Sequence, residues 1–203
     1  MVMVMVARSH VFVITGPSGV GKGTLIRALL ERMPELRLAV SATTRPPRAG
    51  ERDGVHYHFL AQGDFDARVS AGEFVEHVAY AGHSYGTLRS ELEGGDSGPG
   101  GPVVLEIEVQ GARLIRNALP YATLIFIAPP SLEELRARLC GRATDDPEKI
   151  ERRLAVAGEE LQAAPEFAHV VLNDEVDRAL AELEAIVRNA LACNGSVEIE
   201  AGA

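Results

Sequence analysis

The chain has 203 residues, a length that suits one domain or one core with an inserted lobe. Apolar residues make up 46% and charged residues 24%, which excludes a chain dominated by disorder, and no segment approaches the roughly 20 consecutive apolar residues of a membrane span. The net charge of −9 argues against general binding to a nucleic-acid backbone. Residues 1–9 lack the pattern of a secretory signal, and two cysteines without disulfide or metal-ligand spacing favour a reducing, cytoplasmic compartment.

Apolar runs and helical periodicity alternate along the chain. Short β-branched runs predict buried strands at residues 10–15, 38–42, 103–109, 122–128 and 170–172. Apolar residues at helical spacing predict helices at 24–33, 150–161 and 176–187, and a capping box of Ser131 and Glu134 opens another. This alternation favours an α/β fold with a mostly parallel sheet covered on both faces.

Residues 41–90 interrupt the alternation. The segment mixes polar and aromatic residues in short runs, which predicts a small inserted lobe with hairpin-like strands. The glycine- and proline-rich residues 94–102 have the composition of a flexible linker. We expect residues 1–9 and 193–203 to be a flexible extension and tail.

A glycine-rich loop stands between the first predicted strand and the first predicted helix. Its glycines allow consecutive backbone N–H groups to turn toward phosphate oxygens, the helix start adds a positive end, and Lys22 adds a full charge. Strand, loop, lysine and helix together predict a nucleotide-binding P-loop, with a turn that binds no ligand as the structural alternative. The residues expected to contact ATP here are Gly16, Pro17, Ser18, Gly19, Val20, Gly21, Lys22, Gly23 and Thr24.

The hydroxyl of this loop is displaced by one position. Gly23 follows the lysine and Thr24 comes next, a spacing that resembles small nucleotide kinases more than GTPases or motor ATPases. Thr24 is the candidate Mg²⁺ ligand, and the alternative is that nucleotide oxygens and water hold the ion.

Five later segments form a specific set of motifs. They are SATTRPPRAGE at 41–51, DGVHYHF at 53–59, EFVE at 73–76, YGT at 85–87 and LEIEVQG at 105–111. Together with the P-loop they closely resemble the guanylate kinase family of P-loop nucleoside monophosphate kinases, over about residues 10–190. The resemblance implies a three-layer core of residues 10–40, 91–133 and 160–192, a mixed α/β GMP-binding lobe at 41–90 and a helical lid at 134–159.

The resemblance assigns residues of the lobe to GMP. Arg45 and Arg48 match positions that grip its phosphate, and two guanidinium forks suit a dianion. Tyr57 and Tyr85 match hydroxyl donors to the same phosphate. Glu76 matches the carboxylate that recognises guanine, whose N1–H and 2-amino donors can pair with one carboxylate, whereas adenine offers no such pair. Three further positions of the pocket match Ser41, Thr87 and Glu108.

The resemblance also assigns residues around the ATP phosphates and adenine. Arg138 and Arg142, four apart on one helical face, and Arg153 match the lid arginines, and Ala143 stands where relatives usually carry glycine. Asn173 matches a segment beside adenine, with a helix N-cap as the alternative.

The predicted reaction is phosphoryl transfer from ATP to GMP, giving ADP and GDP, with Mg²⁺ as cofactor. Its expected catalytic residues are Lys22, Arg45, Arg142 and Arg153, and Glu106 would either orient metal-bound water or serve a structural role. A kinase for another phosphorylated acceptor, such as a ribose bisphosphate, would share Lys22 without needing Glu76. A phosphopeptide-binding scaffold would typically have a degraded P-loop. ATP and GMP are the expected partners, without nucleic acid, membrane or obligate protein partner.

Overall fold

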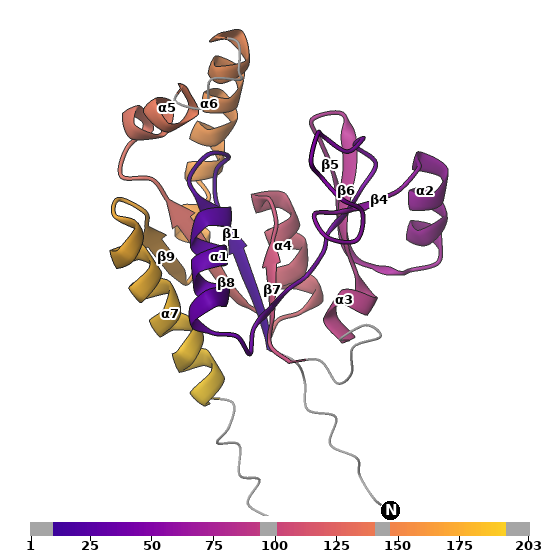
Figure 1. The fold of residues 1–203 in the computed structure, drawn as a ribbon, viewed down its shortest axis with the longest axis horizontal. Coiled ribbons are helices and arrows are strands. Elements are labelled where there is room, and N and C mark those ends of the chain that lie inside the picture. Colours follow the sequence, from indigo (N-terminus) through magenta and orange to yellow (C-terminus); the bar gives the residue numbers. More distant parts are fainter. Residues whose placement is uncertain (1–9, 94–100, 141–146, 194–203) are drawn as a thin grey trace, which may run out of the picture.

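The computed structural model describes residues 10–93, 101–140 and 147–193, which form two sheets surrounded by helices (Figure 1). The predicted extension at 1–9, residues 94–100 of the predicted linker, Arg142 with Ala143, and residues 194–203 of the tail lie outside this description.

The larger sheet has five parallel strands. In spatial order they are β2 (Arg37–Leu38), β7 (Val103–Glu106), β1 (Val11–Thr15), β8 (Thr123–Ala128) and β9 (His169–Leu172). The central strand β1 is buried on both faces, with Phe12 and Ile14 in one apolar cluster and Val11 and Val13 in the other. A strand covered on both faces has no polar side, which is why its sequence is an uninterrupted apolar run.

Helices cover both faces of this sheet and make it the middle of three layers. On the face of Phe12 lie α1 (Lys22–Arg32) and α7 (Val176–Cys193), and on the other lie α4 (Val109–Ala118) and a short 3₁₀ helix at Ala164–Glu166. A pair of helices, α5 (Leu132–Cys140) and α6 (Pro147–Leu161), stands beyond the carboxyl end of β1 (Figure 1). No helix of the described residues is both long and apolar enough to cross a membrane.

The smaller sheet is built from the segment between β2 and β7. Its order is β4 (His58–Phe59), β3 (Ala42–Thr43), β6 (His83–Leu88) and β5 (Phe74–Tyr80), with α2 (Gln62–Ser70) packed on it and α3 (Arg89–Glu93) after β6. The strands β5 and β6 form a hairpin, closed by Ala81 and Gly82 with φ angles of 49° and 81°. Two consecutive positive φ angles match the right-handed twist of the flanking strands.

The α/β class and the parallel sheet are confirmed, and two strand predictions need correction. The apolar run 38–42 is not one strand, because β2 ends at Leu38 in the larger sheet and β3 begins at Ala42 in the smaller one. The run 103–109 also divides, because β7 ends at Glu106 and Val109 opens α4. A short apolar run cannot by itself show where the chain changes sheet or enters a helix.

Candidate active site

Two adjoining cavities open at the carboxyl ends of β1 and β7, where ligands of open α/β sheets bind. One of about 430 Å³ is lined by the P-loop, and one of about 940 Å³ reaches into the smaller sheet. The residues that line both are Ser18, Ser41, Arg48, Tyr57, Glu106, Ile107, Glu108 and Arg153. The predicted donor and acceptor sites therefore meet along one wall.

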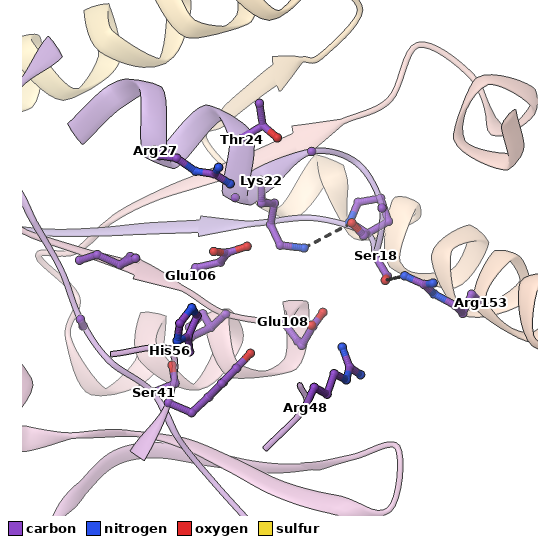
Figure 2. Close-up of a pocket in the computed structure, with 18 residues that line it drawn as sticks. Ser18, Lys22, Thr24, Arg27, Ser41, Arg48, His56, Glu106, Glu108 and Arg153 are labelled. Atoms are coloured by element: carbon purple, nitrogen blue, oxygen red, sulfur yellow. Dashed lines mark hydrogen bonds between the residues drawn. The ribbon is translucent and has the colours of Figure 1, made fainter. Parts of the chain in front are cut away.

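The P-loop runs from the end of β1 to the start of α1. Gly16 has φ of 137°, and a Cβ at this position would lie 2.2 Å from the carbonyl oxygen of Ile127, so no larger residue fits. Lys22 is buried and its Nζ donates to the carbonyl oxygens of Gly16, at 2.6 Å, and Pro17, at 3.3 Å. The ammonium group is thus held over the loop, facing the smaller cavity (Figure 2).

Asn173 supports the loop from behind. Its buried amide Nδ2 donates to the carbonyl oxygen of Val20 at 2.7 Å, and a Cβ on Gly21 would lie 2.6 Å from that nitrogen. The neighbouring Asp174 accepts from the backbone N–H of Glu175 just before α7. Asn173 thus fixes the loop conformation, and its contact with adenine stays a prediction.

Oxygen donors for a metal ion lie in the smaller cavity. Thr24 lines it, and the carboxylate of Glu106 projects into it opposite Lys22 (Figure 2). Burial raises the pKa of Glu106, and the positive charge of Lys22 partly offsets this effect. A hydroxyl and a carboxylate are ligands that suit Mg²⁺, which usually keeps several waters and binds substrate phosphates. The residues present therefore fit an ion that arrives with its nucleotide.

Glu51 holds both arginines of the predicted phosphate site. Its carboxylate accepts from the Arg45 guanidinium at 2.9 and 3.0 Å and from the backbone N–H of Arg48 at 2.7 Å. This pairing raises the pKa of Arg45 and lowers that of Glu51. The Arg45 guanidinium also lies 5.3 Å from the ring centroid of Tyr57, whose ring meets that of Tyr85 edge-on at 6.1 Å.

Glu76 is a buried carboxylate in the wall of the larger cavity. Its side chain is on β5, only 5% of the residue is exposed, and its Oε1 accepts from the Thr87 hydroxyl at 2.8 Å. Burial raises its pKa, and the hydrogen bonds from Thr87 act in the opposite direction. Its Oε2 faces Gly111, where a Cβ would lie 3.1 Å away. One oxygen is therefore engaged by the protein, and the carboxylate as a whole lines the cavity.

The predicted lid arginines are placed unequally. Arg153 on α6 lines both cavities and donates to the Ser18 hydroxyl at 2.8 Å (Figure 2). Arg138 on α5 donates to Glu134 at 3.1 Å and to the Val20 carbonyl at 3.4 Å, beside the loop and outside both cavity walls. Arg142 lies outside the described residues.

Sequence reasoning missed two carboxylates that organise this site. Glu51 belongs to the motif at 41–51, but its role as the partner of Arg45 depends on the turn that brings the two side chains together. Glu160 lies on α6, where its carboxylate interacts with that of Glu108, and its Oε2 is buried without a hydrogen-bond partner among the described residues. Burial, followed by the carboxylate of Glu108, raises the pKa of Glu160 to about 7. No local signal marked it, because its helix pattern is that of a surface glutamate.

Comparisons with known proteins give the family of the chain. The model of the guanylate kinase family matches residues 8–190. The chain belongs to the guanylate kinase family. It is 53% identical to a guanylate kinase of Frankia casuarinae over 86% of this chain and 95% of the relative, and 51% identical to one of Synechococcus sp. strain CC9902 over 89% and 96%.

A solved guanylate kinase has the same fold. The crystal structure of guanylate kinase from Anaplasma phagocytophilum aligns with a TM-score of 0.71 at 30% identity, covering 90% of this chain and 86% of that one. The guanylate kinase match spans the P-loop, both cavities and the α5–α6 pair.

Proposed function

We propose that the chain transfers the γ-phosphate of ATP to GMP, giving ADP and GDP. The observation that carries the proposal is the buried carboxylate of Glu76, held by Thr87, in the wall of a cavity that Arg45 and Arg48 also line. A carboxylate and two guanidinium groups in the wall of one cavity match a guanine base and a phosphate, respectively.

In the donor site, the P-loop would hold the triphosphate of ATP. Backbone N–H groups and the start of α1 bind phosphate oxygens, and Lys22 leaves its loop carbonyls to pair with the β- and γ-phosphates. Thr24, with Glu106 orienting bound water, would hold Mg²⁺. When bound, the ion supplies charge neutralisation at the phosphates.

In the acceptor site, GMP needs no side-chain base. A phosphate monoester is largely dianionic near pH 7, because its second pKa is about 6. Arg45 and Arg48 orient that phosphate, with Tyr57 and Tyr85 as hydroxyl donors, so that one oxygen lines up with the γ-phosphorus of ATP. Ser41 and Glu108, which line the same cavity, would complete the contacts with guanine.

The lid would complete the charge balance. Arg153, already at Ser18 of the P-loop, and Arg142 would reach the transferring phosphoryl group, and Arg138 would join the ATP contacts. Closure of the lobe at 41–90 and the lid at 134–159 would exclude water that otherwise hydrolyses ATP. We place the reaction in the cytoplasm, supported by the free thiols of Cys140 and Cys193.

The test is an ADP-release assay with a panel of phosphorylated acceptors. We expect turnover with GMP and little with AMP, CMP, UMP or a ribose bisphosphate. A preference for a sugar phosphate would replace GMP as the acceptor, and phosphopeptide binding without any turnover would indicate a scaffold.

A further inference from the structure

Glu91, on the short helix α3, contacts three separate segments of the chain. Its Oε2 accepts from the backbone N–H of Val40 at 2.9 Å, and its Oε1 lies 2.9 Å from His58 Nε2. Its backbone carbonyl accepts from the guanidinium of Arg37. We call this set the Glu91 junction.

The junction lies where the chain passes between the two sheets. Arg37 belongs to β2 of the larger sheet, Val40 lies in the crossing at 39–41, and His58 belongs to β4 of the smaller sheet. The helix α3 follows β6 and leads the chain from the smaller sheet toward β7 of the larger one (Figure 1). One residue therefore connects the larger sheet, the incoming crossing, the smaller sheet and the outgoing helix.

The segments held by Glu91 carry residues of the acceptor cavity. Val40 directly precedes Ser41, and His58 directly follows Tyr57. Ser41 and Tyr57 line both cavities, and the Ser41 carbonyl accepts from the His58 backbone N–H at 2.9 Å. A change in the junction would shift these two cavity residues without any contact between Glu91 and a substrate.

The interactions of the junction are partly shielded from solvent and involve a carboxylate. The side chain of Glu91 is 18% exposed and that of His58 is 31% exposed, so solvent is partly excluded from their contact. Hydrogen bonds to a carboxylate are shorter and stronger than those between neutral groups. Removing the carboxylate would also leave the Val40 N–H without the partner it has here.

We propose that Glu91 is a positioning residue for GMP, holding the smaller sheet at the angle to the larger one at which Ser41 and Tyr57 meet the nucleotide. The inference rests on the proposed function. Glu91 raises the fraction of molecules with an aligned acceptor site, and the apparent dissociation constant scales with the inverse of that fraction. Loss of the junction would weaken GMP binding and leave the P-loop, on the larger sheet, unchanged.

The test is the variant Glu91→Ala, with Glu93→Ala as the matched control from an exposed position of the same helix. Calorimetric titration with GMP and, separately, with ATP gives both dissociation constants, and steady-state kinetics gives both KM values. If the aligned fraction falls to about a tenth, the Kd and KM for GMP rise about tenfold in Glu91→Ala, and those for ATP stay within twofold. Glu93→Ala should match the wild type. An unchanged GMP affinity, or equal losses for GMP and ATP, would overturn the proposal.

A second set of variants keeps the test valid if Glu91→Ala folds poorly. Glu91→Gln retains one acceptor oxygen and should weaken GMP binding by only about two- to threefold. His58→Ala should weaken it as well, and its effect should be smaller in a Glu91→Gln background because the two residues act as a pair. If the effects of the two substitutions on GMP binding were independent, the two residues would not act as a pair and the proposal would be wrong. A wild type that does not bind GMP would refute the proposed function, whereas GMP binding unaffected by all these variants would refute only the role of Glu91.

Discussion

The two oxygens of Glu76 have different surroundings, and this leads to a prediction about base recognition. In Glu76→Gln the amide oxygen can keep the hydrogen bond from Thr87, which places an amide donor against the donors of guanine. Losing a charged hydrogen bond and mismatching buried polar groups costs about 2–4 kcal/mol, or about 30- to 1000-fold. We expect that loss in kcat/KM for GMP, with the KM for ATP nearly unchanged and discrimination against AMP reduced.

The control for this substitution is Glu73→Gln, which removes an exposed carboxylate paired with Arg68 just before β5. It should leave both kcat/KM values at the wild-type level. An unchanged preference for GMP in Glu76→Gln would remove Glu76 from base recognition and weaken the assignment of GMP as acceptor.

Lys22 gives a second prediction, which separates the two substrates. Lys22→Ala removes the only charge that the P-loop itself contributes, and we expect kcat to fall by at least about 100-fold. The Kd for GMP should stay within a few-fold, because the acceptor contacts come from other segments. Rapid-quench kinetics together with GMP titration measures both quantities, and near-native turnover would show that the loop does not hold the donor.

At the scale of single residues, the sequence was informative where a residue type occurs in a specific motif. The P-loop lysine and the order of Arg45, Arg48, Tyr57 and Glu76 could be recognised in this way. The roles of Glu51 and Glu91 could not, because each depends on partners brought together by a turn or by the meeting of two sheets. A surface glutamate and a glutamate that fixes a cavity wall look alike in a sequence.

At the scale of elements, the close contact between the P-loop and β8 predicts that alanine at Gly16 destabilises the fold, whereas alanine at Gly63 does not. Gly16→Ala would force a side chain against the Ile127 backbone at a φ of 137°, so we expect a loss of about 2–4 kcal/mol in the free energy of unfolding. Gly63→Ala, on α2 with open space around it, should be neutral or stabilising by up to about 1 kcal/mol. Urea unfolding of both variants checks this, and equal effects would contradict the tight contact at Gly16.

Three strands of the larger sheet were predictable because each is a continuous apolar run with a definite end. Residues 10–15, 122–128 and 170–172 correspond to β1, β8 and β9, with small shifts at their ends. The run 38–42 was misassigned because Leu38 and Ala42 look alike in a sequence, yet they belong to different sheets. An apolar side chain does not show which sheet its residue joins, and Leu38, at 40% exposed, is not even buried.

For the whole molecule, the carboxyl pair of Glu108 and Glu160 predicts a dependence of stability on pH. Burial and Glu108 raise the pKa of Glu160 from 4.5 to about 7, so the folded chain binds this proton more tightly than the unfolded chain. Between about pH 4.5 and 7 the folded state therefore holds more protons, and its stability falls as the pH rises through that window. Glu160→Gln should reduce the fall in Tm between pH 5 and 8.

Glu159→Gln, a change at the exposed neighbouring position, should retain the wild-type slope of Tm against pH. Part of the slope should remain in Glu160→Gln as well, because burial also raises the pKa values of Glu76 and Glu106. Identical slopes in wild type and Glu160→Gln would show that Glu160 is ionised in the folded protein throughout this range.

The insertion of the smaller sheet between β2 and β7 also affects how the chain folds. The central pairing of Val11 with Val103 must wait until the whole inserted segment has been synthesised, and contacts between residues so far apart in sequence form slowly. The hairpin of β5 and β6, by contrast, joins residues that are close in sequence and needs only its two-residue turn. During translation we expect the hairpin to form on the nascent chain first, while β1 remains unpaired on both edges and dependent on rapid completion of β7 and β8.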